Sequence, residues 1–137
     1  MKVVIDTNVI IAGLRSPGSA AARIVDMAIA GEIQPIGSFK TKQEAARLAQ
    51  RGGISREQWS KVDRLLYRTL EVSAETKFSI STDRSDNLYF EAAHAGWAQY
   101  IITNDHHLLE HDGFWGIRVL RPGDFLKTLD HGRPSDD

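Results

Sequence analysis

Two acidic residues of this sequence follow short apolar runs, in positions where a folded chain could bring them together. Asp6 comes directly after residues 3–5, and Asp105 follows residues 100–102 after two polar positions. Runs that are apolar at every position are typical of strands buried on both faces of a parallel sheet. Because open α/β sheets bind ligands at the carboxyl ends of their strands, Asp6 and Asp105 would meet there if their strands are neighbours.

Two further acids could reach the same edge from helices. Asp86 lies at the expected start of a helix, where the helix dipole and free amides favour an ionised carboxylate. Glu44 lies within the helix expected over residues 38–50, and its side chain could extend over the edge from outside. Such clustered carboxylates repel one another unless a cation lies among them. Oxygen ligands without cysteine or a matched histidine pair suit Mg²⁺ or Mn²⁺, which can activate water and stabilise charge on a phosphate during in-line displacement.

Some of these residues also have a purely structural explanation. The side chains of Asp6, Thr7 and Asn8 can all accept bonds from the amides of a first helical turn. Asp83 lies one turn before Asp86 and could be either a substitute ligand or the cap of the following helix. The residue types alone leave both explanations open.

Length and composition limit the protein class. The chain of 137 residues predicts a single domain over residues 1–130, with a polar tail over 131–137 that is expected to be disordered. The absence of cysteine excludes disulfides and thiolate metal sites. No apolar segment reaches about 18 residues, so we expect a cytoplasmic protein without a membrane span. The net charge of −1 gives no general attraction for nucleic acid, so RNA binding would depend on local basic patches or bound metal.

Strand and helix patterns alternate along the chain. The expected strands are residues 3–5, a weaker segment at 32–37, and residues 100–102 and 117–120, while residues 75–80 are expected to form either a strand or an extended crossing segment. Pro35 removes a backbone donor and therefore favours an edge or a strand end for the second of these. The expected helices follow residue 6, cover 20–30 and 38–50, and begin near Ser55, Asn87 and Pro122. This alternation predicts a three-layer α/β/α sandwich with a mostly parallel central sheet.

The helix after Ser55 carries an apolar stripe from Trp59 to Leu70. Packing against the core is the first explanation of this stripe. A partner or dimer surface is the alternative, because the helical hairpin formed with residues 38–50 is an insertion in a plain alternation of strands and helices.

Four blocks of the sequence, in this order and spacing, resemble a PIN domain, and specifically the PIN-family toxins of bacterial toxin–antitoxin pairs. The blocks are residues 3–9, 38–44, 83–90 and 100–109, and the similarity extends from Lys2 to about Leu126. Each block alone is a weak signal, whereas the four together are specific. The resemblance implies a PIN-like sandwich and Mg²⁺- or Mn²⁺-dependent cleavage of RNA.

The resemblance also implies roles for individual residues and partners. The implied acidic, metal-binding and catalytic residues are Asp6, Glu44, Asp86 and Asp105. Asn8 and Thr103 match polar residues that hold a carboxylate or water beside these acids. The segment around Glu44 is more polar than the family's usual helix, which keeps Asp83 as an alternative fourth acid. The usual partner is a small antitoxin whose segment blocks the active site, and homodimers are common.

Four other residues are candidates for contact with RNA, namely His106, Arg15, Lys40 and Arg84. A solvated surface position is the alternative for each of the three cations. His106 stands beside Asp105, which places it near the expected chemistry.

The favoured function is hydrolysis of RNA by water, without a covalent enzyme intermediate. Two other functions are alternatives to it. The first is an inactive PIN-like module that binds a partner protein, and the presence of all four acids argues against it. The second is a phosphate-transfer fold in which Asp6 is the nucleophile. That fold needs a lysine late in the chain near the site, and Lys127 stands in the wrong setting.

Overall fold

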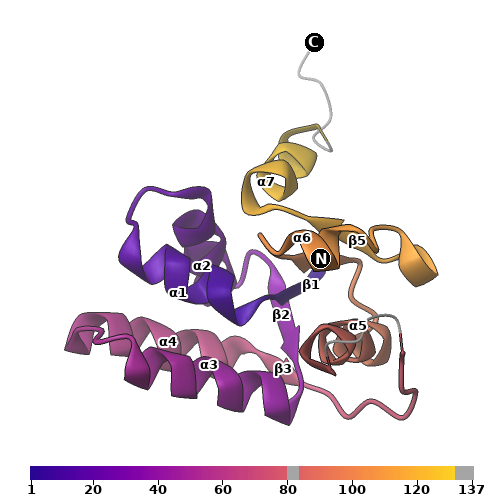
Figure 1. The fold of residues 1–137 in the computed structure, drawn as a ribbon. Helices are drawn as coiled ribbons and strands as arrows, with labels where there is room; N and C mark the ends of the chain where they lie inside the picture. Colours follow the sequence, from indigo (N-terminus) through magenta and orange to yellow (C-terminus); the bar gives the residue numbers. More distant parts are fainter. Residues whose placement is uncertain (80–83, 132–137) are drawn as a thin grey trace.

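The computed structural model describes residues 1–79 and 84–131 and is built around a five-stranded parallel sheet (Figure 1). The strand order is β3-β2-β1-β4-β5. The strands are β1 (Lys2–Ile5), β2 (Gln34–Gly37), β3 (Leu70–Glu71), β4 (Tyr100–Ile102) and β5 (Arg118–Leu120). Helices flank the sheet on both faces, so the predicted α/β sandwich with a parallel sheet is confirmed.

The helices pack on the two faces of the sheet through two separate apolar clusters, one on each face. The helices are α1 (Thr7–Arg15), α2 (Ala20–Ala30), α3 (Phe39–Arg51), α4 (Arg56–Arg68), α5 (Arg84–Gly96), α6 (His106–Leu109) and α7 (Pro122–His131), with the 3₁₀ turn η1 (Phe114–Gly116). Val3 and Ile5 pack with α1, α2, α3, α4 and α7, whereas Val4 packs with α5 and α6 on the opposite face. Strand β1 is therefore buried on both faces, as its apolar run predicts. No helix within residues 1–79 and 84–131 is long and apolar enough to cross a membrane.

Local capping sets the ends of several helices. The hydroxyl of Ser19 accepts the N–H of Ala22 at the start of α2, and that helix ends at Gly31 in the left-handed conformation, with φ of +81°. Ser55 and Gln58 form the predicted capping box at the start of α4. These signals can be read in the sequence because each depends on residues only a few positions apart.

Of the two positions that Pro35 favours, an edge strand or a strand end, only the edge is wrong, because Pro35 lies next to the first residue of β2. Strand β2 lies second from the edge, between β3 and β1. Its first half pairs with β1, where Gln34 donates to the carbonyl of Met1, and its pairing with β3 begins at Ile36. Pro35 is tolerated because its missing N–H falls before the part of the strand that pairs with β3.

Residues 75–79 contain no strand, so the strand alternative for residues 75–80 is wrong for its described part, and the alternative of an extended crossing segment remains. The corresponding parallel strand is the two-residue β3, whose side chains are exposed and give no apolar run. Leu70 belongs to this strand and not to the preceding helix, because α4 ends at Arg68 and Thr69 caps it. The rest of the predicted stripe does pack, since Val62 and Leu65 are buried in the core.

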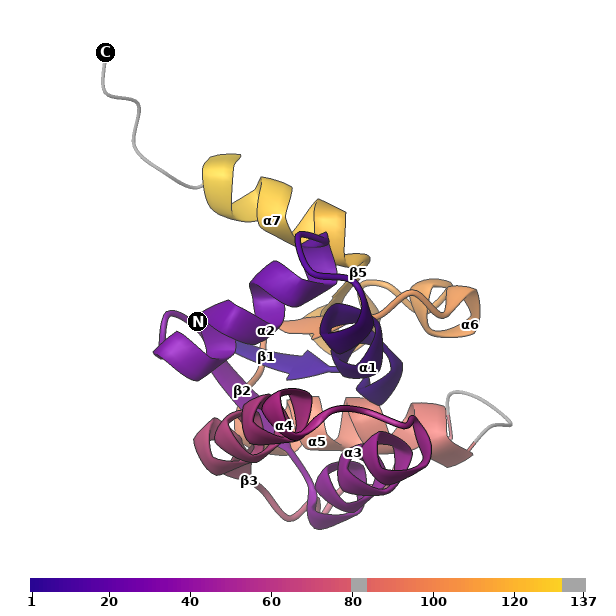
Figure 2. The same cartoon turned by 90° about the vertical axis from the view of Figure 1, so that its left-hand side faces the viewer.

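Helix α5 lies very close to the sheet. A Cβ atom built on Gly96 would overlap the Cγ2 atom of Ile36 in β2, so this contact requires glycine. On the other side of the molecule, α3 and α4 run side by side as the predicted helical hairpin (Figure 2). The first turn of α5, at the opposite end of the helix from Gly96, carries the acidic residue Asp86.

Candidate functional site

The carboxylate of Asp6 lies at the carboxyl end of the central strand β1. Its backbone N–H donates to the carbonyl of Ile102 over 2.9 Å, which extends the pairing of β1 with β4. One carboxylate oxygen, Oδ1, accepts the N–H of Asn8 over 3.0 Å and thereby caps α1. The prediction that Asp6 caps a helix is thus confirmed. Asp6 is also 3% exposed and lies at the carboxyl end of a strand, where ligands bind in open α/β sheets, so capping does not prevent a role in a functional site.

Two side chains from other elements complete the surroundings of Asp6. The hydroxyl of Tyr89 donates to Oδ1 over 3.2 Å, and that of Thr103 donates to Oδ2 over 2.7 Å. Hydrogen bonds of this kind satisfy the oxygens of a buried carboxylate and hold it in one orientation. An ionised carboxylate has about four acceptor positions, so the three bonds to Asp6 leave room for a cation.

Thr103 connects the ends of β1 and β4. It is fully buried, and its Oγ1 accepts the N–H of Asp105 over 3.0 Å while donating to Asp6. The strands are parallel neighbours, with Ile5 opposite Ile102, as the meeting of Asp6 and Asp105 requires. Asp105 is partly buried, and its Oδ1 accepts the N–H of His107 over 2.9 Å at the start of α6.

Tyr89 is a site residue that the sequence patterns do not identify. Its oxygen lies 2.6 Å from Oγ1 of Thr7 and also accepts the N–H of Thr7 over 3.3 Å. Burial, and then the charge of Asp6, raises the pKa of the Tyr89 phenol far above its usual value, so Tyr89 remains a neutral donor. The signal that could have found it is helical spacing, because Tyr89 lies three residues after Asp86.

Asp86 belongs to the first turn of α5 and is 4% exposed. Residues three apart on a helix lie on the same face, so Asp86 shares the face from which Tyr89 reaches Asp6. The helix start also stabilises a negative charge at this position. Helix α5 therefore places Asp86 on the same helical face as the hydrogen-bond donor Tyr89.

Glu44 lies on α3 at a pocket of about 350 Å³. The lining residues are Lys40, Thr41, Gln43, Glu44, Arg47, Leu88 and Tyr89. Since Tyr89 both lines this pocket and contacts Asp6, the pocket adjoins the buried carboxylate. The Glu44 side chain is 41% exposed and forms an ion pair with Arg47 over 2.6 Å.

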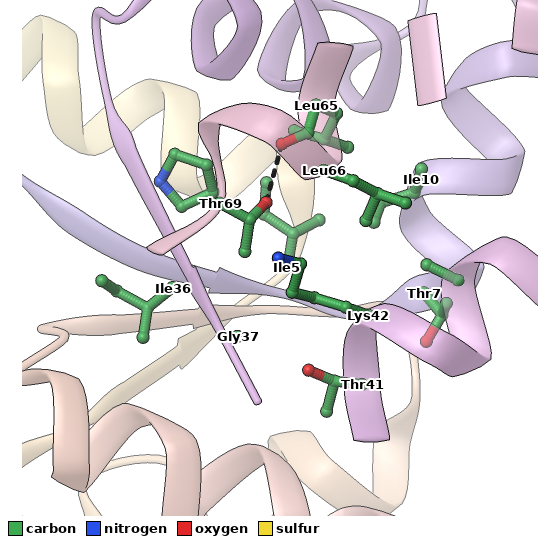
Figure 3. Close-up of a pocket in the computed structure, with 12 residues that line it drawn as sticks. Ile5, Thr7, Ile10, Ile36, Gly37, Thr41, Lys42, Leu65, Leu66 and Thr69 are labelled. Atoms are coloured by element: carbon green, nitrogen blue, oxygen red, sulfur yellow. Dashed lines mark hydrogen bonds between the residues drawn. The ribbon is translucent and has the colours of Figure 1, made fainter. Parts of the chain in front are cut away.

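A second cavity near the site is too small for a substrate. It has a volume of about 30 Å³ and lies between β1, β2 and the helices α1, α3 and α4 (Figure 3). Thr7 and Thr41 contribute polar groups, whereas most of the lining is apolar, with Ile5, Ile10 and Leu66 among its residues. A space of this size accommodates only about one or two water molecules, so it belongs to the core.

The two predicted RNA-binding cations with described side chains lie in different places. Lys40 lines the pocket together with Glu44. Arg15 lies in the last turn of α1, roughly 12 Å along that helix from Thr7, and donates to the carbonyl of Gly52 over 3.3 Å. The structure therefore places Lys40 in the same pocket as Glu44, whereas Arg15 lies at the far end of α1.

The remaining predicted residues differ in how they relate to the acids. Asn8 contributes its backbone N–H to Asp6, while its side chain is exposed. His106 is exposed and directly follows Asp105. Asp83 lies outside the described residues, as do residues 132–137 of the predicted tail, and only the backbone of Arg84 is described.

The comparison with known families agrees with this arrangement. A family model described as a PIN domain matches residues 2–107, a segment that contains Tyr89, Thr103 and the four acids. PIN domains are generally metal-dependent nucleases. No curated protein shows a significant sequence match to the chain. Because the family model covers well over half of the sequence and the sheet has the expected architecture, the chain belongs to the PIN domain family.

Proposed function

We propose that this PIN domain is a metal-dependent endoribonuclease that hydrolyses phosphodiester bonds of RNA. The observation that carries this proposal is the hydrogen-bonded unit of Asp6, Thr103 and Asp105 at the carboxyl ends of two neighbouring strands. A buried carboxylate held in one orientation beside a second acid is a suitable ligand for a divalent cation.

The chemistry of the donor set fits a hard cation. Asp6, Asp86 and Asp105 offer only oxygen ligands, which suit Mg²⁺ or Mn²⁺. Asp6 is 3% and Asp86 is 4% exposed, and a divalent cation would offset the repulsion between two buried carboxylates placed near each other. In the proposal these three acids hold the cation, which supplies water activation and charge neutralisation at the phosphate.

Neighbouring side chains orient the acids and the substrate. Thr103 and Tyr89 hold the two oxygens of Asp6, and the raised pKa of Tyr89 keeps its proton in place throughout the neutral range. Lys40, in the pocket beside Glu44, is placed to contact the RNA backbone. Glu44 completes the acidic quartet when its exposed pair with Arg47 opens, at a cost of about 1 kcal/mol or less.

We further propose a role as the toxin of a cytoplasmic toxin–antitoxin pair, with a small antitoxin as partner and a homodimer as the assembly. The resemblance of the four sequence blocks to PIN-family toxins supports this role. The surface also offers large apolar side chains for protein contacts, since Tyr67 is 89% and Trp97 is 82% exposed. Expression of the wild-type chain in a bacterial host should arrest growth, whereas expression of Asp6→Asn should not.

Cleavage of a labelled mixture of single-stranded and hairpin RNAs in the presence of Mn²⁺ tests the nuclease proposal. Asp6→Asn, Asp86→Asn and Asp105→Asn should each abolish cleavage, and EDTA should do the same to the wild type. Asp124→Asn is the matched control, because Asp124 is an exposed acid on α7 that pairs with Lys127. Undiminished cleavage by the acid variants, or cleavage in EDTA, would refute the mechanism. RNA or protein binding by a wild type that cleaves no RNA would favour the inactive binding module.

A further inference from the structure

Asp105, His106 and His107 bring three potential metal ligands together at the start of α6. One ligand atom from each side chain lies within 4.8 Å of the other two. We infer that these three residues form a binding site for a transition-metal ion of the Zn²⁺ class. This site differs in ligand chemistry from the all-carboxylate site proposed above, although it shares Asp105 with it.

The backbone of this short segment is well anchored. Asp105 donates its N–H to Thr103, and its carbonyl accepts the N–H of Leu109 over 3.0 Å. The N–H of His107 donates to Oδ1 of Asp105 over 2.9 Å, which orients the carboxylate and leaves Oδ2 outside that bond. The carboxylate is thus positioned before any ion binds.

The two imidazoles lie on the same side of the segment. Their ring centroids are 4.0 Å apart with an angle of 37° between the ring planes, although residues adjacent on a helix usually diverge. Both His106 and His107 are exposed, so their rings can rotate at low cost. In a tetrahedral site with bonds of about 2.1 Å, the ligand atoms are separated by roughly 3.4 Å. Rotation of exposed rings that already lie within 4.8 Å of Asp105 can reach this separation without movement of the backbone.

The ligand types select the class of ion. Two imidazoles and one carboxylate suit Zn²⁺, Co²⁺, Ni²⁺ or Cu²⁺, and the order of affinities for such ligands places these ions well above Mn²⁺. Mg²⁺ prefers oxygen ligands and retains several of its waters, so the two histidines add little to its binding. Three protein ligands leave a fourth position for water, as in many zinc sites.

Sharing of Asp105 has a consequence for the proposed nuclease. An ion held by His106 and His107 would draw on the same carboxylate that the nuclease site requires, so Zn²⁺ should inhibit cleavage that Mg²⁺ supports. This consequence rests on the proposed function, whereas the binding of Zn²⁺ itself does not.

The binding test uses the full chain without an affinity tag and without RNA. Titration with ZnCl₂ by calorimetry, and with CoCl₂ by visible absorption, reports ion binding directly. His106→Ala and His107→Ala should each weaken Zn²⁺ binding by about tenfold or more, which corresponds to about 1.4 kcal/mol. His94→Ala is the matched control, since His94 is an exposed histidine on α5. This substitution should leave the affinity for Zn²⁺ unchanged.

Parallel titrations with Mn²⁺ separate the two sites. The histidine variants should leave Mn²⁺ affinity unchanged, whereas Asp105→Asn should weaken the binding of both ions. Equal Zn²⁺ affinity in the wild type and both histidine variants would overturn the site, as would an equal loss of Mn²⁺ and Zn²⁺ affinity in the histidine variants. If the chain binds Zn²⁺ as expected but cleaves no RNA, the nuclease proposal fails while the zinc site stands.

Discussion

Thr103 donates its hydroxyl proton to Oδ2 of Asp6 over 2.7 Å, and the Oγ1 atom of Thr103 accepts the N–H of Asp105 over 3.0 Å. One uncharged side chain therefore sets the relative position of two acids from neighbouring strands. Thr103 is fully buried, so water cannot replace either bond. The geometry of the proposed metal site depends on this residue as much as on the acids themselves.

Thr103→Val should lower the free energy of unfolding by about 1–3 kcal/mol, because valine has a similar shape but leaves Asp6 and the N–H of Asp105 without their partner. Mn²⁺ affinity should fall as well, since Asp6 loses its orientation. Urea unfolding measures the first effect and calorimetry the second. Thr103→Ser keeps the hydroxyl and should restore the affinity for Mn²⁺. A valine variant with wild-type affinity would show that Thr103 does not position the acids.

Tyr89→Phe should preserve the fold and weaken Mn²⁺ binding by about tenfold or more, because it removes the hydroxyl that donates to Asp6. Tyr100→Phe is the matched control. Tyr100 keeps its ring contact with Phe125 in that variant, and no bond to the acids is lost. Equal Mn²⁺ affinity in the two variants would mean that Tyr89 only fills space.

Sequence patterns and the family resemblance pointed to the acids but could not supply their hydrogen bonds. Asp6 and Asp105 could be identified from the sequence because each follows a doubly buried strand, and the two strands are indeed neighbours. Tyr89 was missed, because its contact with Asp6 spans 83 positions in the chain and its helical spacing from Asp86 is the only local signal for it. The role of Asn8 could not be predicted either. Its backbone N–H donates to Asp6, whereas the side chain, which was the predicted contact, is exposed.

In the fold as well, the features set by residues close in sequence could be predicted, whereas the features set by contacts far apart in sequence could not. The α/β class and the capped helices could be predicted because periodicity and capping depend on near neighbours. Strand β3 could not, because Leu70 and Glu71 form a strand only through pairing with Ile36 and Gly37. The order of the strands likewise depends on packing across the whole domain.

Gly96→Ala should destabilise the protein by about 1–3 kcal/mol, although alanine favours helices, because the added Cβ overlaps Ile36 in the closely packed interface of α5 and β2. Urea unfolding of Gly96→Ala, Ile36→Ala and the double variant measures the coupling energy between these two positions. Ile36→Ala should cost less in the Gly96→Ala background than in the wild type. Additive effects would show that α5 moves away from the sheet instead.

Asp112 should give the protein a pH-dependent contribution to stability. Burial raises the pKa of Asp112, but hydrogen bonds from Arg118 and the N–H of Val119 outweigh this and hold the pKa below its usual value. A lowered folded-state pKa gives stability that is present above the unfolded-state pKa and is lost as the pH falls through the folded-state pKa. Asp112→Asn should therefore cost about 0.5–1 kcal/mol at pH 7, and the difference from wild type should begin to shrink near about pH 4 and be lost as the pH falls through the lower folded-state pKa of Asp112. Urea unfolding across this range would contradict the account if the difference grew in acid.

Thermal unfolding of wild type and Asp6→Asn with and without Mn²⁺ tests the metal site without knowledge of the substrate. Asparagine can still cap α1, so the variant should fold. An ion at about ten times its Kd stabilises the wild type by about 1.4 kcal/mol, or roughly 3–8 °C for a domain of this size. The account predicts a shift of this order in the wild type and its loss in Asp6→Asn. No shift in the wild type, or an equal shift in both proteins, would contradict it.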